Sequence, residues 1–226
     1  MQAKKTRIIH DLQEYLRFFE DLGVDYVLPV PRTGKEQVSR PSGLQDLEAE
    51  IRSCKGCSLH KSRTHAVPGE GDVQAELMFV GEGPGYDEDL QGRPFVGRAG
   101  QLLTKIIGAM GFARENVYIT NVVKCRPPDN RNPRSEEIAA CAPYLQRQMA
   151  AVKPRIIVSL GNVPTQFLLD TSSGISSLRG SFHSLGDALV MPTFHPSYLV
   201  RNEQNRELKR KVWEDMKKVM AELAGR

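Results

Sequence analysis

The stretch AELMFVGEGPGYDED, residues 75–89, indicates the fold class of this chain. Its first six residues form an apolar run typical of a buried strand, and the polar, glycine-rich residues 81–89 follow directly. Three further apolar runs occur at residues 117–120, 155–160 and 188–191. Helical patterns separate these runs, and strands that alternate with helices predict a mostly parallel, four-stranded sheet covered on both faces.

Apolar residues at helical spacing predict the helices that connect these strands. The expected helices span residues 97–110, 135–152, 162–169 and 203–223. In open sheets of this kind, ligands bind at the carboxyl ends of the strands. The loops that follow the strands are therefore the first place to look for functional residues.

The N-terminal part of the chain has a different pattern. Residues 8–22 carry apolar side chains at helical spacing, and residues 29–43 are polar and rich in proline and glycine. We expect residues 1–43 to form a helix with a flexible linker, and residues 44–226 to form the main domain. The helix either docks a partner or packs back on the core.

Composition and charge are those of an ordinary globular protein. The chain has 226 residues, a net charge of +4 and a pI of about 8.9, which permits a polyanionic partner without requiring one. The N-terminus lacks the apolar core of a signal peptide, and no apolar run approaches the length of a membrane span. We therefore expect a cytoplasmic protein without membrane contact.

The four cysteines of the chain suggest a metal site. Cys54 and Cys57 form a C-x-x-C pair, Cys125 lies in the run KCRPP, and Cys141 follows later. Four thiolates suit zinc or an iron–sulfur cluster, and the long gap between the last two favours a [4Fe–4S] cluster over a zinc ribbon. Spacing alone leaves both metals open. The alternatives are four buried thiols or two disulfides, which require an oxidising compartment.

Three loops after predicted strands carry candidate binding groups. Glycines within residues 81–85 let the backbone approach a ligand, although the loop matches no nucleotide-binding motif. Asn121 can read the edge of a heterocycle or simply cap a turn. His195 is either functional or structural, and Phe95 is either a core residue or a stacking platform.

Taken together, these segments resemble the family 4 uracil-DNA glycosylases, the iron–sulfur branch of that superfamily. The matching segments are GEGPGYDEDLQGRPFVGRAGQLL (81–103), VYITNVVKCRPP (117–128), RIIVSLG (155–161) and FHPSYLVRN (194–202), with the four cysteines in the same order. The resemblance covers about residues 44–223. It implies a three-layer α/β sandwich of the uracil-DNA glycosylase type, with the N-terminal helical extension outside it.

The resemblance also implies an activity and a set of site residues. The chain would flip deoxyuridine out of DNA, hydrolyse its N-glycosidic bond and release uracil for base excision repair. The cysteines would hold a structural [4Fe–4S] cluster. The catalytic residues would be His195, Asn121, Glu82 and Glu88, and the base would be bound by Gly83, Gly85, Phe95, Asn121 and His195. The aspartate that orients water in the best-known branch has no clear match here.

Two finer expectations concern specificity and turnover. Thymine must be excluded by bulk near its methyl group, and we expect Tyr86 or Glu88 to supply it. A related branch bonds covalently to the abasic sugar through a histidine that follows the third cysteine. Residues 126–140 contain no histidine, so we expect turnover and release rather than crosslinking.

DNA contacts are expected from basic and loop residues at the same edge of the sheet. The candidates are Lys124, Arg126, Ser197, Tyr198, Leu199 and Arg201, together with Arg131 and Arg134. Tyr198 and Leu199 could wedge into the gap left by the flipped base, or Leu199 could be a core residue with the arginines as ordinary surface. The substrate would be uracil-containing DNA, single- or double-stranded. We expect a monomer, with residues 1–43 available to tether a repair or replication partner.

Two other classes of function fit the same residues less well. One is a metal-stabilised DNA-binding module without catalysis, and the other is a zinc protein that acts as an interaction scaffold. Asn121, Phe95 and His195 argue against the first. A visible thiolate-to-iron absorbance would exclude the second.

Overall fold

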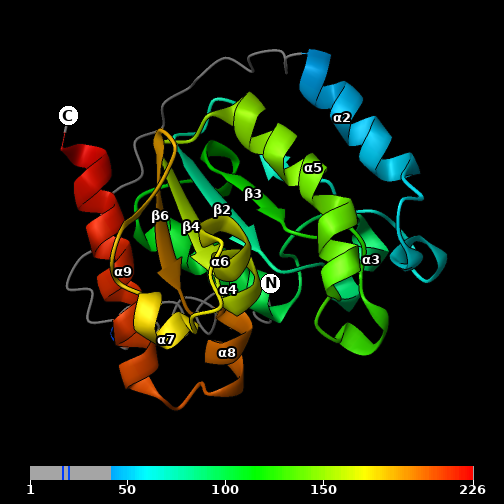
Figure 1. The fold of residues 1–226 in the computed structure, drawn as a ribbon. Coiled ribbons are helices and arrows are strands. Elements are labelled where there is room, and N and C mark those ends of the chain that lie inside the picture. The colour runs from blue at the N-terminus through cyan, green and yellow to red at the C-terminus, as the bar shows by residue number, and fades with distance from the viewer. Residues whose placement is uncertain (1–16, 18–19, 21–41, 226) are drawn as a thin grey trace, which may run out of the picture.

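The computed structural model describes residues 17, 20 and 42–225, and a sheet of six strands lies at its centre (Figure 1). Its strand order is β1-β3-β2-β4-β6-β5. The four inner strands are parallel: β3 (Tyr118–Asn121), β2 (Leu77–Gly81), β4 (Ile156–Leu160) and β6 (Ala188–Thr193). The predicted parallel sheet is therefore confirmed.

Two short strands extend the sheet beyond the prediction. β1 (Glu70–Gly71) pairs antiparallel with β3, and β5 (His183–Leu185) pairs antiparallel with β6. Both are too short to show an alternating pattern, so the sequence did not indicate them.

Helices cover both faces of the sheet and make the three-layer sandwich that was predicted (Figure 1). One face carries α4 (Arg98–Ala109), α8 (Pro196–Arg201) and α9 (Arg206–Ala224), and the other carries α2 (Ser42–Ser53), α5 (Ser135–Val152) and α6 (Asn162–Leu169). Alternate residues of each strand enter the two cores: Phe79 packs with α4, and Met78 packs with α2 and α5. Every residue of β2, β3 and β4 is buried, as expected for parallel strands between two helical layers.

The connections contain further short elements. These are the helices α3 (Tyr86–Gln91) and α7 (Ile175–Leu178) and the 3-10 turns η1 (Ser58–Lys61), η2 (Arg114–Asn116) and η3 (Pro128–Asn130). The C-terminal helix begins three residues later than predicted, because the side chain of Asn205 caps it by accepting a hydrogen bond from the backbone N–H of Leu208.

The N-terminal predictions fall almost wholly outside the described residues. The helix expected at residues 8–22 is described only at residues 17 and 20, and the last two residues of the expected linker belong to α2. The division into residues 1–43 and 44–226 therefore stays a prediction. Within the described part of the chain, no helix is both long and apolar enough to cross a bilayer.

Candidate active site and cysteine cluster

A cavity of about 450 Å³ opens where the four parallel strands end. The loops after these strands supply its walls, as the sheet topology requires. All residues predicted to be catalytic or base-binding line it, namely Glu82, Gly83, Gly85, Glu88, Phe95, Asn121 and His195. The structure thus brings together side chains that are more than one hundred residues apart in sequence.

Asn121, the last residue of β3, presents an unused acceptor in this cavity. The residue is 1% exposed, and its Oδ1 atom is buried without a hydrogen-bond partner among the described residues. A buried acceptor left unsatisfied costs about 1–3 kcal/mol, so the site is built for a ligand that donates a hydrogen bond. Gly81 leaves room for the amide, because a Cβ there would lie 2.4 Å from Oδ1.

Phe95 and His195 form an aromatic wall beside Asn121. Their ring centroids lie 5.7 Å apart with an interplanar angle of 31°. Phe95 is buried and has a φ of +50°, a left-handed conformation that is uncommon for a residue with a side chain. Phe95 is therefore a core residue that also lines the cavity, and its role as a stacking platform stays a prediction.

The hydrogen bonds of His195 determine its tautomer. It caps α8, and its Nδ1 atom accepts a hydrogen bond from the backbone N–H of Ser197 at 3.0 Å. Burial lowers the pKa of His195 to about 4, and the charge of Arg201 acts in the same direction. The imidazole is therefore neutral near pH 7 and carries its proton on Nε2, which makes it a hydrogen-bond donor.

The two carboxylates of the cavity have different environments. Burial raises the pKa of Glu82. Glu88 accepts backbone hydrogen bonds from Val96 and Gly97 at 2.8 and 2.9 Å through Oε1, and from Gly85 at 3.1 Å through Oε2. This arrangement favours a positioning role for Glu88 over the catalytic role that the sequence predicted.

The position of Tyr86 does not support its predicted role in thymine exclusion. It is 57% exposed, and the guanidinium of Arg126 lies 5.1 Å from the centroid of its ring. Within residues 42–225 it is not part of the cavity lining, whereas Glu88 is. Of the two candidates, the geometry leaves only Glu88 in a position to contact a base.

Several predicted DNA-contacting residues line the cavity or adjoin a lining residue in sequence. Ser197 and Arg201 line it, Tyr198 and Arg201 are exposed, and Arg126 is partly exposed. Arg131 also lines the cavity, although its guanidinium pairs with the buried carboxylate of Glu137 at 2.7 Å. The sequence did not single out other lining residues, Asn130, Asn132 and Asn162, because polar loop residues carry no distinctive pattern.

Two of the predicted DNA contacts are wrong. Lys124 is 1% exposed, and its ammonium donates hydrogen bonds to Thr120 Oγ1 at 2.7 Å and to Gln148 Oε1 at 2.6 Å. Leu199 is also 1% exposed and belongs to the core beneath α4 and α8, so it is the core residue that the alternative foresaw. Neither side chain can reach DNA from these positions.

The four cysteines line a second, smaller cavity between the end of α2, the loop after β3, and α5. All four are free, so the structure does not support the disulfide alternative. Three of the sulfurs accept hydrogen bonds: Arg63 donates to Cys125 at 2.9 Å, and backbone N–H groups donate to Cys54 and Cys141, both at 3.3 Å. In residues 42–225, however, no three His, Cys, Asp or Glu residues are arranged to hold a single metal ion.

Burial makes ionised sulfur unfavourable in this cavity. It raises the pKa of the Cys125 thiol, and it raises that of Cys141 to about 11. A bound metal ion would offset this penalty, because metal ions deprotonate a coordinating thiol. The donor set and its N–H hydrogen bonds fit a metal–sulfur group.

Comparison with known proteins identifies what this arrangement resembles. The model of the Uracil DNA glycosylase superfamily matches residues 68–217. A Type-4 uracil-DNA glycosylase of Thermotoga maritima is 48% identical over 182 residues, which cover 80% of this chain and 94% of the relative. One of Archaeoglobus fulgidus is 44% identical, with 81% and 94% covered. A Type-5 uracil-DNA glycosylase of Pyrobaculum aerophilum is 32% identical, with 59% and 66% covered.

Proposed function

This chain belongs to the uracil-DNA glycosylase superfamily, whose members hydrolyse N-glycosyl bonds, and we propose that it removes uracil from DNA in base excision repair. The observation that carries the proposal is that one cavity holds the neutral imidazole of His195 and the buried Oδ1 of Asn121, which has no hydrogen-bond partner in the part of the chain that the structure describes. The product would be free uracil and an abasic site. No histidine occurs in residues 126–140, which supports release of the DNA rather than a covalent adduct.

Asn121 supplies the recognition of uracil. The N3–H group of uracil donates a hydrogen bond, and its O4 atom accepts one. The amide of Asn121 complements both, because Oδ1 accepts and Nδ2 donates. Cytosine presents the opposite pattern and would leave Oδ1 without a donor. Stacking of the base on Phe95 adds about 1–3 kcal/mol.

His195 supplies the stabilisation of charge. Breaking the glycosidic bond leaves negative charge on the departing base, and a donor already in place at a base oxygen contributes about 2.7–4 kcal/mol. The Nε2–H group of His195 is such a donor. Glu82 lines the same cavity, and its raised pKa suits a carboxylate that accepts a proton from the attacking water.

The cavity can receive only a base that has left the stack. Extruding a nucleotide costs a few kcal/mol in duplex DNA and least at a mismatch or in a single strand. Ser197 and Arg201 line the cavity, and we propose that they bind the phosphates and sugars around the extruded nucleotide together with Arg126 and Tyr198. Both single- and double-stranded uracil-containing DNA are proposed substrates.

Cys54, Cys57, Cys125 and Cys141 are proposed to hold a [4Fe–4S] cluster. All four thiols line one cavity, and four thiolates suit an iron–sulfur cluster. A cluster held by these cysteines would link α2, the loop after β3, and α5 structurally. No step of the hydrolysis involves it.

Further parts of the proposal rest on the sequence alone. We propose a cytoplasmic monomer in which residues 44–226 carry the activity. Residues 1–43 would tether a repair or replication partner. Deletion of residues 1–43 should then leave uracil release intact and abolish capture of that partner.

Release of uracil from a labelled oligonucleotide tests the central proposal. Purified, fully metallated protein should make an oligonucleotide with one deoxyuridine sensitive to alkali, and free uracil should appear in equal amount. A thymidine-containing oligonucleotide is the matched control. Binding of DNA without release of uracil would instead identify a non-catalytic DNA-binding module, and the proposed function would be wrong.

A further inference from the structure

The backbone around Phe95 is held in an unfavourable conformation. Its φ of +50° lies in the left-handed region, which residues with side chains rarely adopt. The backbone of Phe95 also packs tightly on α4, because a Cβ added to Gly100 of this helix would lie 1.9 Å from the carbonyl carbon of Phe95. Such a conformation persists only when neighbouring groups hold it in place.

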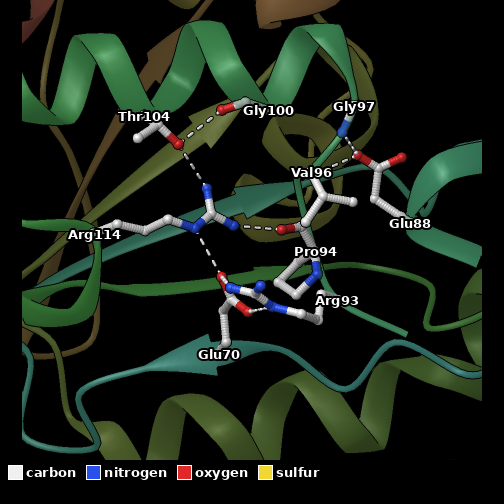
Figure 2. A network of polar contacts seen from close by, with 9 residues as sticks. All are labelled: Glu70, Glu88, Arg93, Pro94, Val96, Gly97, Gly100, Thr104 and Arg114. Carbon is white, nitrogen blue, oxygen red and sulfur yellow. Dashed lines mark hydrogen bonds and ion pairs between the residues drawn. The ribbon is translucent and has the colours of Figure 1, made fainter. Parts of the chain in front are cut away.

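Arg114 holds the peptide group that precedes Phe95 (Figure 2). Its guanidinium donates a hydrogen bond to the carbonyl oxygen of Pro94 and another to Thr104 Oγ1 at 3.1 Å. Thr104 in turn donates to the carbonyl oxygen of Gly100 at 3.0 Å. One arginine therefore connects the Phe95 loop to the helix on which it packs.

Glu70 orients this arginine from the edge strand β1. Its carboxylate accepts from Nε of Arg114 at 2.7 Å and from Nε of Arg93 at 2.8 Å (Figure 2). The side chains of Arg114 and Glu70 are 16% and 19% exposed, so water screens their ion pair less than it screens a surface pair. Glu70 thus holds the guanidinium in one orientation.

The peptide groups that follow Phe95 are held by the opposite charge. Oε1 of Glu88 accepts from the N–H groups of Val96 and Gly97 (Figure 2). The ring of Phe95 lies against Gly81 of β2, because a Cβ added to Gly81 would be only 2.5 Å from Cζ of the ring. The ring therefore has no space to move toward this strand. A small shift of the loop would therefore change the shape of the cavity beside Asn121 and His195.

We propose that Arg114, oriented by Glu70, is a positioning residue that holds the ring of Phe95 where it stacks on the extruded base. This inference rests on the proposed function, because stacking on Phe95 is part of it. Arg114 does not line the cavity, so its effect on the reaction passes through Phe95.

A double-mutant cycle tests this dependence. Single-turnover uracil release would be compared for wild type, Arg114→Ala, Phe95→Ala and the double variant. We expect a loss of tenfold or more in each single variant and no further loss when Arg114→Ala is added to Phe95→Ala. Multiplied losses in the double variant would overturn the proposal. Should Arg114→Ala not fold, Glu70→Gln enters the same cycle with the same expectation.

Arg155→Ala is the matched control. Arg155 also pairs with a carboxylate, Glu76, and donates to a backbone carbonyl, that of Leu223, but it precedes β4 at the opposite end of the sheet. Arg155→Ala should change the single-turnover rate of uracil release less than twofold.

Amide hydrogen exchange separates this inference from the proposed function. Arg114→Ala should speed exchange in residues 93–99 at least tenfold and leave residues 135–152 unchanged. An inactive wild-type protein would overturn the proposed function, and amide exchange would still show whether Arg114 holds the Phe95 loop. Unchanged exchange in residues 93–99 of Arg114→Ala would show that Arg114 does not hold the loop.

Discussion

The backbone N–H of Ser197 donates a hydrogen bond to Nδ1 of His195 across 3.0 Å. A backbone amide can only donate, so Nδ1 must be the unprotonated nitrogen of the ring. With a pKa lowered to about 4, the imidazole keeps its single proton on Nε2 throughout the neutral range. His195 is therefore a hydrogen-bond donor at any pH at which the enzyme is expected to work.

This pairing predicts a pH-dependent contribution of His195 to stability. Its pKa is about 4 in the folded state and about 6.5 in the unfolded chain, so the unfolded state binds a proton first as the pH falls. The contribution is complete above pH 6.5 and is lost progressively toward pH 4, by up to about 3 kcal/mol. Urea unfolding of wild type and His195→Gln between pH 4 and 8 measures it.

His183→Gln is the control for this experiment, because His183 lies in the edge strand β5, away from the cavity. It should keep the wild-type decline between pH 6.5 and 4, and His195→Gln should show a smaller decline. Identical curves for wild type and His195→Gln would contradict the assignment.

Asn121→Ala should separate activity from stability. The variant loses the amide that recognises uracil, so we expect uracil release to fall at least about 100-fold. The unsatisfied buried acceptor of Asn121 destabilises the folded wild type by about 1–3 kcal/mol. Its removal should therefore leave the free energy of unfolding the same or raise it. Kinetics and denaturant unfolding together check both expectations.

Gln148→Ala is the contrasting variant. Its buried amide is satisfied by the carbonyl of Pro68, by Tyr118 and by Lys124, so its removal should cost about 1–3 kcal/mol of stability. If Asn121→Ala destabilised the protein as much as Gln148→Ala, the amide of Asn121 would be structural.

Gly81→Ala should damage the cavity from within the sheet. The new Cβ would lie 2.4 Å from Asn121 Oδ1 and 2.5 Å from Phe95 Cζ, so both groups must shift. Misplacement by about 1 Å can cost 100-fold in rate, and we expect a loss of that order in single-turnover assays. Gly174→Ala has no atom within 4 Å of its new Cβ and should retain wild-type activity, which controls for the substitution itself.

Replacement of Cys141 by serine tests the cysteine cluster. Wild-type protein should be brown and contain iron and sulfide, and Cys141→Ser should lose visible absorbance and unfold at lower temperature. The link between α2, the loop after β3, and α5 is lost with the cluster. Ser53→Ala, an exposed neighbour of Cys54, should keep colour and melting temperature. Colourless wild-type protein with one bound zinc would rule out the iron–sulfur assignment.

Arg201→Ala should weaken DNA binding through the phosphates. DNA affinity would be measured in the Asn121→Ala background, with and without Arg201→Ala. Arg201→Ala should lower the affinity, and it should decrease the slope of log affinity against log salt by about one. Lys217→Ala, on the outer helix α9, removes the same charge away from the cavity and should leave the slope unchanged. Equal slopes in all three proteins would mean that Arg201 makes no phosphate contact.

The sequence by itself determined the four parallel strands, the helices that connect them and the edge of the sheet at which the cavity lies. The apolar runs at β2, β3, β4 and β6 and the helical pattern of α5 are local signals that the tertiary structure did not alter. Because the strands are parallel, the residues that follow them had to meet, which explains why Asn121 and His195 line the same cavity.

Only the tertiary structure decided which of these residues face DNA, which are buried and which support the others. Lys124 and Leu199 stand in polar or exposed-looking segments, yet Gln148 and the core around α4 enclose them. Nothing in the sequence near Arg114 connects it with Phe95. Burial and the choice of hydrogen-bond partners depend on contacts between residues far apart in the chain, and no local pattern records those contacts.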